Sequence, residues 1–205
     1  MIESLGVIPD TIDKISILHF QFCNEFYSRP EYINLRSLKG IYVSKINKSD
    51  YFKHDFLAAY YSFLENNIED ELLEFFLKYP NLKYQERIKL RDTTFKKINY
   101  YASYKKERIG QIPLYKCLND IFGVRLILPR VNENIGAITR LLNDKKNNSK
   151  LKWFYHRDKD GYKSFQCYFQ QDNKVLPWEL QIWDIEDEYN NIKAHIEHEA
   201  DRNKI

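Results

Sequence analysis

Two charged residues interrupt an apolar segment near the middle of the chain. The segment LNDIFGVRLILP, residues 118–129, has the composition of a buried strand, but it contains Asp120 and Arg125. Removing a charge from water is costly unless the charge is paired, so each of these residues needs a partner or a chemical role. An internal ion pair is the simplest interpretation, and a binding or catalytic site is the alternative.

A second strand-like segment carries polar residues at alternate positions. In WELQIWD, residues 178–184, the two-residue period of a strand places Glu179, Gln181 and Trp183 on one face. The same period separates Arg125 from the apolar side chains that flank it. Two neighbouring strands of this kind bury one face and present Glu, Gln and Arg side chains on the other. Such a face is either the floor of a site or an ordinary solvated surface.

Basic residues gather in two parts of the chain, although the net charge is only +3. Residues 83–108 contain nine lysines and arginines against three acids, and residues 144–163 contain seven against three. In the first block, Arg87 and Lys89 lie two residues apart on a predicted strand, and Lys97 lies on the helix predicted to follow. Cations on adjacent elements can converge on a polyphosphate. The pattern suits a polyanionic ligand such as a nucleotide or RNA, with a solvated charged surface as the plainer interpretation.

These residues must be positioned by a mixture of helices and strands. Apolar residues at three- and four-residue spacing predict helices through residues 1–80, and later segments alternate as strands do. In chain order, we predict a strand at 84–92, a helix at 93–108 capped by Thr93, a strand at 118–129, a helix at 132–144, strands at 151–156, 164–170 and 175–184 with turns at DKDG and QDNK, and a closing helix from about residue 184. This order predicts an α+β fold in which a mixed sheet of four or five strands is flanked by helices.

The composition indicates a folded, intracellular protein. The chain has 205 residues, of which 43% are hydrophobic and 16% aromatic, so it can bury a core of its own. No apolar run is long enough to span a membrane, and the opening residues MIESLGVIPD lack the regions of a signal peptide. The odd, widely spaced cysteines Cys23, Cys117 and Cys167 indicate reduced core thiols. We therefore expect a cytoplasmic protein without a membrane partner.

Four segments, taken in order, resemble the synthetase domain of the RelA/SpoT family, and in particular the small stand-alone alarmone synthetases. They are RIKLRDTTFKK, NDIFGVRLIL, DGYKSFQ and ELQIW, and the resemblance extends over residues 82–200. The residues at the family's motif positions are Arg87, Lys89, Thr93 and Lys97, then Asp120, Gly123 and Arg125, then Gly161, Tyr162 and Ser164, then Glu179 and Gln181, with His198 where the closing helix often has a His. The resemblance implies a nucleotidyltransferase-like fold for a catalytic domain at residues 81–205, on which the helical residues 1–80 pack.

The resemblance also implies a reaction, the transfer of pyrophosphate from ATP to a ribose 3′-hydroxyl. It assigns Asp120, with help from Glu179, to Mg²⁺, the cofactor that bridges the ATP phosphates. One or two carboxylates suffice for this ion because phosphate oxygens complete its coordination. Glu179 is also the expected catalytic base, and Gln181 orients it. The residues expected to bind ATP are Arg87, Lys89, Thr93, Lys97 and Arg125.

The acceptor side is where the chain departs from the family. The expected acceptor contacts are Tyr162, which stacks on the base, and Gly161, Ser164, Gln166 and Lys159. However, Gln166 replaces the usual His, Asp160 replaces a common Asn or Ser, and Trp183 replaces the Arg of most alarmone makers. Asp158 occupies the place of a Lys, for which the adjacent Lys159 can substitute if the loop shifts.

These departures favour a changed acceptor. Some small relatives are toxins of toxin–antitoxin pairs that pyrophosphorylate the 3′-terminal adenosine of tRNA and stop translation. The basic loop DKKNNSKLK could follow an RNA backbone, with an ordinary solvated loop as the plainer interpretation. We favour tRNA as the acceptor, with a cognate antitoxin and a homo-oligomer among the partners that the resemblance allows. The alternatives are a (p)ppGpp synthetase that uses GDP or GTP, a maker of adenosine-type alarmones, and a non-catalytic nucleotide- or RNA-binding regulator. Intact Asp120 and Glu179 argue against the last, because a pure binder gains little from carboxylates beside phosphates.

Overall fold

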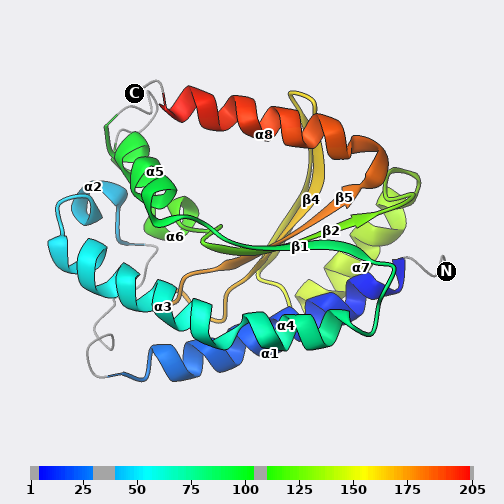
Figure 1. The fold of residues 1–205 in the computed structure, drawn as a ribbon, viewed down its shortest axis with the longest axis horizontal. Coiled ribbons are helices and arrows are strands. Elements are labelled where there is room, and N and C mark those ends of the chain that lie inside the picture. The colour runs from blue at the N-terminus through cyan, green and yellow to red at the C-terminus, as the bar shows by residue number, and fades with distance from the viewer. Residues whose placement is uncertain (1–4, 30–39, 104–109, 204–205) are drawn as a thin grey trace.

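The protein is built around one five-stranded sheet with helices on both faces (Figure 1). The computed structural model describes residues 5–29, 40–103 and 110–203. The strands are β1 (Lys83–Ile88), β2 (Phe122–Leu128), β3 (Trp153–Lys159), β4 (Tyr162–Phe169) and β5 (Trp178–Asp184). They lie in the order β1–β2–β5–β4–β3, with β2 and β5 parallel and the other neighbours antiparallel. The predicted α+β fold with a mixed sheet is confirmed.

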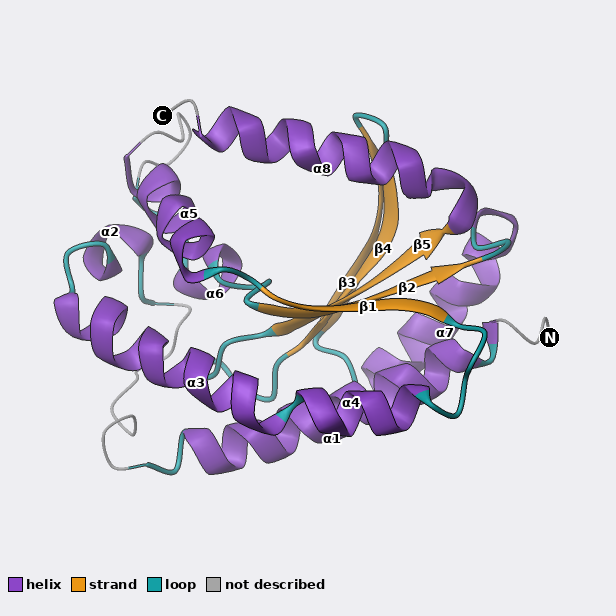
Figure 2. Ribbon diagram, in the orientation of Figure 1, coloured by secondary structure: helices purple, strands orange, loops and turns teal. Residues whose placement is uncertain are grey.

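The helices divide between the two faces of the sheet. They are α1 (Val7–Phe26), α2 (Val43–Ile46), α3 (Leu57–Asn67), α4 (Glu69–Phe76), α5 (Arg91–Ser103), α6 (Leu114–Cys117), α7 (Ile135–Asn147) and α8 (Glu188–Asn203), with short π or 3₁₀ segments η2 (Tyr51–Phe56), η3 (Asn132–Asn134) and η4 (Ile185–Asp187). Helices α1, α3 and α4 cover one face, whereas α5 and α8 lie over the other (Figure 2). Within the described ranges, no helix has both the length and the apolar character needed to cross a membrane.

The face of the sheet toward α1 and α3 is apolar, as the alternation predicts. Val124 and Leu126 of β2 and Leu180 and Ile182 of β5 are at most 1% exposed. Successive strand residues point to opposite faces, so burying these four side chains turns the residues between them toward α5 and α8. We call that second face, which carries Arg125 and its polar neighbours, the open face.

The N-terminal helices pack directly on the apolar face. Trp178, fully buried at the start of β5, packs edge-on against Phe22 of α1 with ring centroids 5.2 Å apart. Its Nε1 donates to the hydroxyl of Tyr60 in α3 at 3.0 Å, which satisfies both polar groups inside the core. The described helices before β1 therefore share a core with the sheet. A division into two domains stays a prediction.

The register of the sheet aligns the polar residues in rows. Gly123 and Arg125 of β2 lie opposite Glu179 and Gln181 of β5. On the other side of β5, Tyr168 lies opposite Glu179 and Gln166 lies opposite Gln181. Because paired residues of neighbouring strands point to the same face, these side chains meet on the open face.

The hairpin between β3 and β4 is as tight as DKDG predicts. Asp160 and Gly161 have φ values of 56° and 74°, the left-handed conformation that a two-residue hairpin turn requires at both positions. An Asp-Gly pair adopts it readily, because glycine has no Cβ and Asp tolerates the region. The turn fixes where the strand residues beside it point.

One predicted helix start was wrong. The strand predicted at YQERIKLRD ends at Ile88, and α5 begins at Arg91. The backbone N–H of Lys89 still bonds to the carbonyl of Ile121 at 2.7 Å, and the N–H of Thr94 already bonds back to the carbonyl of Leu90 at 3.0 Å, so the helix follows the strand directly. Thr93 therefore lies inside the first turn of α5 and does not cap it.

The predicted helical segments also differ in their bounds. The segment predicted as helical before Pro80 is divided into η2, α3 and α4. The closing helix α8 begins at Glu188, later than predicted, because the carboxylate of Asp184 accepts the backbone N–H of Glu186 at 3.1 Å and holds a 3₁₀ turn first.

Candidate active site

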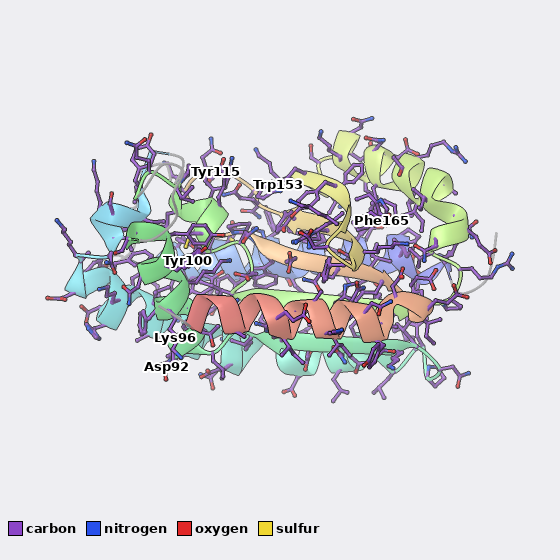
Figure 3. All side chains as sticks on the ribbon, turned by 90° about the horizontal axis from the view of Figure 1, so that it is seen from above. Asp92, Lys96, Tyr100, Tyr115, Trp153 and Phe165 are labelled. Atoms are coloured by element: carbon purple, nitrogen blue, oxygen red, sulfur yellow. The ribbon has the colours of Figure 1, made fainter. Side chains whose placement is uncertain are left out.

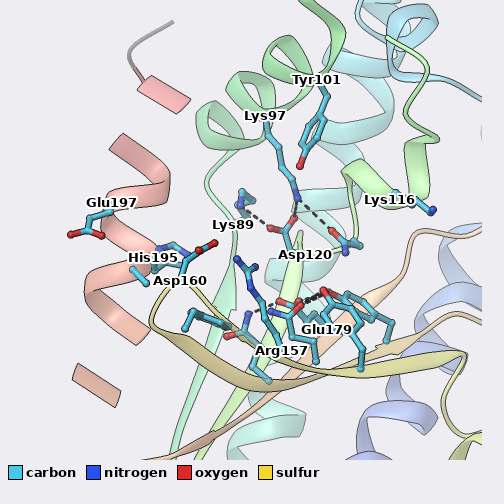
Figure 4. Close-up of a pocket in the computed structure, with 17 residues that line it drawn as sticks. Lys89, Lys97, Tyr101, Lys116, Asp120, Arg157, Asp160, Glu179, His195 and Glu197 are labelled. Atoms are coloured by element: carbon cyan, nitrogen blue, oxygen red, sulfur yellow. Dashed lines mark hydrogen bonds and ion pairs between the residues drawn. The ribbon is translucent and has the colours of Figure 1, made fainter. Parts of the chain in front are cut away.

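Two cavities adjoin between the open face of the sheet and α8. The β1 cavity, of about 310 Å³, lies over β1 and β2, and the β4 cavity, of about 470 Å³, lies over β3 and β4 (Figure 4). Four residues line both cavities: Asp120, Glu179, Gln181 and His195. A ligand in one cavity therefore lies next to a ligand in the other.

Asp120 is held by two buried lysines. Lys89, just after β1, donates from Nζ to Oδ2 at 2.9 Å, and Lys97 of α5 donates to Oδ1 at 2.8 Å (Figure 4). The lysine side chains are 2% and 6% exposed, whereas Asp120 is 25% exposed toward the cavities. Burial disfavours the charged carboxylate, but Lys97 and Lys89 outweigh it and hold the pKa of Asp120 well below its usual range. Asp120 is therefore a permanent anion surrounded by cations.

Glu179 has the opposite electrostatic setting. Its carboxylate is buried, with Tyr168 donating to Oε1 at 2.8 Å and Gln181 donating from Nε2 to Oε2 at 2.8 Å. Burial, and then the charge of Asp120, raise the pKa of Glu179 above its ordinary value, although both hydrogen bonds act against the rise. Two carboxylates on one site thus have pKa values displaced in opposite directions. Such a pair separates a permanent anion from a group that can take up a proton.

Arg125 has partners of a different kind from those of Asp120. Its Nε donates to Oε1 of Gln181 at 3.1 Å and one terminal nitrogen donates to Oε1 of Gln85 at 2.8 Å. The guanidinium carbon lies 3.6 Å from the ring centroid of Trp183, a cation–π contact. The two charges of the central segment thus do not need each other: lysines neutralise Asp120, while amide oxygens and an indole ring stabilise Arg125.

A hydrogen-bonded network of neutral groups forms the floor of the β4 cavity. Oε1 of Gln166 accepts from the hydroxyl of Tyr155, and the hydroxyl oxygen of Tyr168 lies 3.2 Å from the same atom. Tyr168 has a single proton, and its shorter bond to the Glu179 carboxylate takes that proton. Glu179 in turn accepts from Gln181, and Gln181 accepts from Arg125 of the neighbouring strand β2 on the same open face.

Tyr162 lines the β4 cavity but is largely covered. Its side chain is 7% exposed, its ring meets Trp183 edge-on at 5.8 Å, and its hydroxyl accepts from the Trp183 Nε1 at 3.3 Å. The guanidinium of Arg157 lies 5.0 Å from the Tyr162 ring centroid. An acceptor base that stacks on this ring must therefore either displace the guanidinium of Arg157 or stack together with it.

The other expected site residues divide into two groups. Arg87 lines the β1 cavity, and one of its terminal nitrogens lies 3.1 Å from Nε2 of His195. Thr93, Gly161, Ser164 and Lys159 line neither cavity. Among them, Ser164 is buried and Lys159 is 75% exposed, 3.9 Å from the carboxylate of its neighbour Asp160. The roles assigned to these residues stay predictions.

Several cavity residues were missed in the sequence. Tyr155 and Arg157 alternate on β3 as a site face requires, so the two-residue period could have found them. Tyr168 shares its strand face with Gln166, which the motif had already indicated. On α8, His195 lines both cavities, one turn before His198, whose side chain lies outside the described ones.

The residues present suit a magnesium ion that phosphates help to coordinate. Among the described residues, no group of three or more His, Cys, Asp or Glu side chains is placed to hold a metal by itself. Mg²⁺ commonly takes one or two carboxylates and completes its coordination with phosphate oxygens and water. Asp120 and Glu179 line both cavities and supply those carboxylates, and each carboxylate oxygen retains a second lone pair beside its present hydrogen bond.

Comparison with known proteins gives similarity in fold. No protein-family model matches the chain, and no curated protein matches it. The structural neighbours include small alarmone synthetases. Small alarmone synthetase 2 from Bacillus subtilis has a TM-score of 0.43 and 15% identity, over 74% of this chain and 83% of that one. Small alarmone synthetase 1 from the same organism, bound to its product pppGpp, has a TM-score of 0.38 and 21% identity, over 73% of this chain and 79% of that one. The same synthetase bound to AMPCPP has a TM-score of 0.36 and 19% identity, over 70% of this chain and 74% of that one.

These neighbours are of the kind that the four motifs resemble. At such low identity and partial overlap, the assignment of an activity rests on the residues of the site itself.

Proposed function

We propose that this chain is a pyrophosphokinase that transfers the pyrophosphate of ATP to a ribose 3′-hydroxyl. The observation that supports it most is the meeting of two cavities at two carboxylates whose pKa values are displaced in opposite directions. A group transfer needs two substrates side by side, a fixed charge to hold phosphate and a base for the attacking hydroxyl. A binding protein for one nucleotide needs none of these together.

We assign ATP to the β1 cavity. Arg87 and Arg125 line it and suit the base and phosphates of a nucleotide, because guanidinium groups both stack and bind phosphate. Lys89 and Lys97 line the β4 cavity and bind Asp120, which both cavities share, so they would neutralise charge on phosphates transferred between the two. Asp120 and Glu179 would hold Mg²⁺, which supplies charge neutralisation to the polyphosphate when bound.

The transfer step then follows from Glu179. The 3′-hydroxyl of the acceptor gives its proton to Glu179, and its oxygen forms a bond to the β-phosphorus of ATP. The bond between the β-phosphorus and the bridging oxygen to the α-phosphate breaks, and AMP leaves with that oxygen. The hydrogen bonds from Tyr168 and Gln181 fix the orientation of the carboxylate. The raised pKa of Glu179 makes it a better proton acceptor than an ordinary carboxylate.

The β4 cavity is assigned to the acceptor, for which we favour the 3′-terminal adenosine of tRNA. Asp160 and Glu197 line this cavity together with the cations Lys116 and Arg157. A free GTP brings a 5′-triphosphate into a cavity whose wall includes these carboxylates, whereas the last nucleoside of an RNA brings one phosphodiester. Lys159, expected to help bind the acceptor, lies outside the cavity. Modification of tRNA ends would stop translation, so this function also predicts an antitoxin.

GDP or GTP is the second candidate acceptor, because the hairpin retains Gly161, Tyr162 and Ser164 of the guanine-binding pattern.

The test of the proposed function is to incubate the protein with γ-labelled ATP and, separately, GDP, GTP, bulk tRNA, and tRNA whose terminal 3′-hydroxyl has been removed. We expect label on intact tRNA alone. Label on GDP or GTP alone would assign an alarmone synthetase instead, and ATP binding without any transfer would leave only a nucleotide-binding regulator.

A further inference from the structure

A third depression continues from the β4 cavity along the outer edge of the sheet. We call it the β3 groove: it has a volume of about 620 Å³ and shares Lys116, Asn119 and Tyr155 with the β4 cavity. From there it extends past Trp153 to Lys152 at the start of β3. A chain whose last residue lies in the β4 cavity thus has a direct path out along the groove.

The groove is lined by aromatic rings. Tyr115 of α6 meets Trp153 of β3 edge-on at 6.1 Å, and both can be found in Figure 3. Trp153 in turn stacks on Tyr168 at 4.7 Å with the planes 16° apart. Tyr155 is 44% exposed and lies nearly parallel to Tyr168 at 6.1 Å. An aromatic series therefore leads from the groove to the residue that holds Glu179.

The charges in the groove are all of one sign. Lys116 and Lys152 are exposed, and the remaining described lining residues are aromatic or carry amides, with no carboxylate among them. This contrasts with the β4 cavity, where Asp160 and Glu197 are part of the wall. Rings for stacking, amides for hydrogen bonds and cations for phosphates are the combination by which proteins hold single-stranded nucleic acid.

We propose that the β3 groove binds the unpaired nucleotides that precede the acceptor nucleoside at the 3′ end of an RNA. This inference rests on the proposed function, and it states why a polymer is a better acceptor than a free nucleotide. Bases stack against Tyr115 and Tyr155, and Lys152 binds a backbone phosphate upstream of the reactive nucleoside. A base-paired 3′ end cannot enter, because its bases are already stacked on their own strand.

The experiment compares acceptors of increasing length. Pyrophosphate transfer from γ-labelled ATP is measured on adenosine 5′-monophosphate, on a single-stranded tetranucleotide ending in adenosine, and on a blunt RNA duplex with the same 3′ end. We expect the tetranucleotide to exceed the mononucleotide in kcat/KM by about tenfold or more, since two stacked bases are added. The duplex should be as poor as the mononucleotide.

Variants then assign the preference to the groove. Lys152→Ala and Tyr115→Ala should each reduce the advantage of the tetranucleotide by about fivefold while the mononucleotide rate stays within about twofold. Tyr115→Phe keeps the ring and should keep the advantage. Lys78→Ala, an exposed lysine beyond α4 on the opposite side of the sheet, is the matched control for lost charge.

The possible failures are distinguishable. Equal rates on the tetranucleotide and the mononucleotide, or a length preference untouched by both groove variants, would overturn the groove assignment and leave pyrophosphate transfer standing. Transfer to GDP or GTP alone would overturn the RNA acceptor and the groove with it. Transfer to no acceptor would overturn the enzymatic function itself.

Discussion

The two halves of the site use different physical means. On the ATP side, Asp120 is fixed by two buried ammonium groups, an arrangement of full charges at distances below 3 Å. On the side that we assign to the acceptor, the neutral hydroxyl of Tyr155 donates to the neutral amide of Gln166, and the hydroxyl of Tyr168 donates to Glu179. The first half contains the residues that resemble the RelA/SpoT synthetase motifs, and the second contains the departures from that pattern. Charges that hold phosphate have few substitutes, whereas a pocket for a base and a ribose can be rebuilt from many neutral side chains.

Trp183 connects the halves and illustrates the difference. It stands where most alarmone makers have Arg, and it contacts Arg125 on the ATP side and Tyr162 on the acceptor side. A second guanidinium at this position would lie against Arg125 and repel it. The indole instead offers a ring face to the guanidinium and an N–H to the tyrosine, so both contacts are favourable.

The largest effect is expected where the halves meet. Glu179→Gln should lower the rate of pyrophosphate transfer about 1,000-fold, because it removes the base, while ATP affinity stays nearly unchanged. Rates are followed with γ-labelled ATP and binding with a non-hydrolysable analogue. Glu133→Gln, in an exposed pair with Arg130, is the control and should be silent. A folded Glu179→Gln protein with normal turnover would remove Glu179 from the mechanism.

Breaking the charged half should damage both activity and folding. Asp120→Asn leaves Lys89 and Lys97 buried without their counter-ion, which should reduce the free energy of unfolding by about 3 kcal/mol. Mg²⁺-dependent ATP binding and turnover should weaken together, by about 100-fold in kcat/KM. Denaturant titration and a Mg²⁺ titration measure the two effects. Asp13→Asn breaks a more exposed pair with Lys145 and should reduce the free energy of unfolding by less than about 1 kcal/mol. Equal losses of stability in the two variants would contradict the difference between the buried and the exposed ion pairs.

The neutral half should respond through the acceptor alone. Tyr162→Ala removes the ring from the β4 cavity and should lower kcat/KM for the acceptor about 30-fold, with the KM for ATP unchanged. Tyr162→Phe loses only the bond from Trp183 and should cost about threefold. Parallel titrations of both substrates decide the point. A shift in the ATP titration instead would mean that the cavities have been assigned to the wrong substrates.

The rate should also depend on pH through Glu179. Lowering the pH through its raised pKa protonates the base, so the rate should fall about tenfold per pH unit on the acid side. Asp120 does not contribute, because its pKa lies well below its usual range and it stays ionised. The measurement is a pH profile of kcat/KM, with and without Glu179→Gln. An acid limb that persists in the residual activity of the variant would belong to another group.

The smallest effect is expected outside the cavities. Lys159 is 75% exposed and lines neither cavity, so Lys159→Ala should change acceptor kcat/KM by no more than about twofold. Arg157, two residues earlier on β3, lines the β4 cavity and should matter more. If Lys159→Ala lowers acceptor kcat/KM more than Arg157→Ala does, Lys159 has the acceptor role that the motif resemblance gave it.

The local sequence predicts which face a residue occupies, but not its partner. Alternation placed Glu179, Gln181 and Arg125 on one face, because the period of a strand is local. The bond between Arg125 and Gln181, residues 56 positions apart, depends on the pairing of β2 with β5, and no local pattern encodes that register.

The positions at which helices begin were harder to predict from the sequence than the faces of the strands. Which residues of α8 line the cavities depends on where the helix begins, which the turn at Asp184 sets, so the sequence pattern did not identify His195. Thr93 was assigned as a cap because the apolar periodicity of the segment does not reveal that the helix begins at Arg91. Boundaries of this kind are decided by one or two backbone hydrogen bonds, for which several nearby residues compete.

The central claim is that the bond broken in ATP lies between the α- and β-phosphates, with pyrophosphate moved to the acceptor. The direct test runs the reaction twice, with ATP labelled at the α-phosphorus and at the γ-phosphorus, and separates AMP, ADP and the acceptor. The account predicts α-label in AMP and γ-label on the acceptor, in equal amounts, and neither after the 3′-hydroxyl is removed. Label from the α-phosphorus on the acceptor would show nucleotidyl transfer, and ADP formed in step with a labelled acceptor would show transfer of a single phosphate; either result would contradict the account.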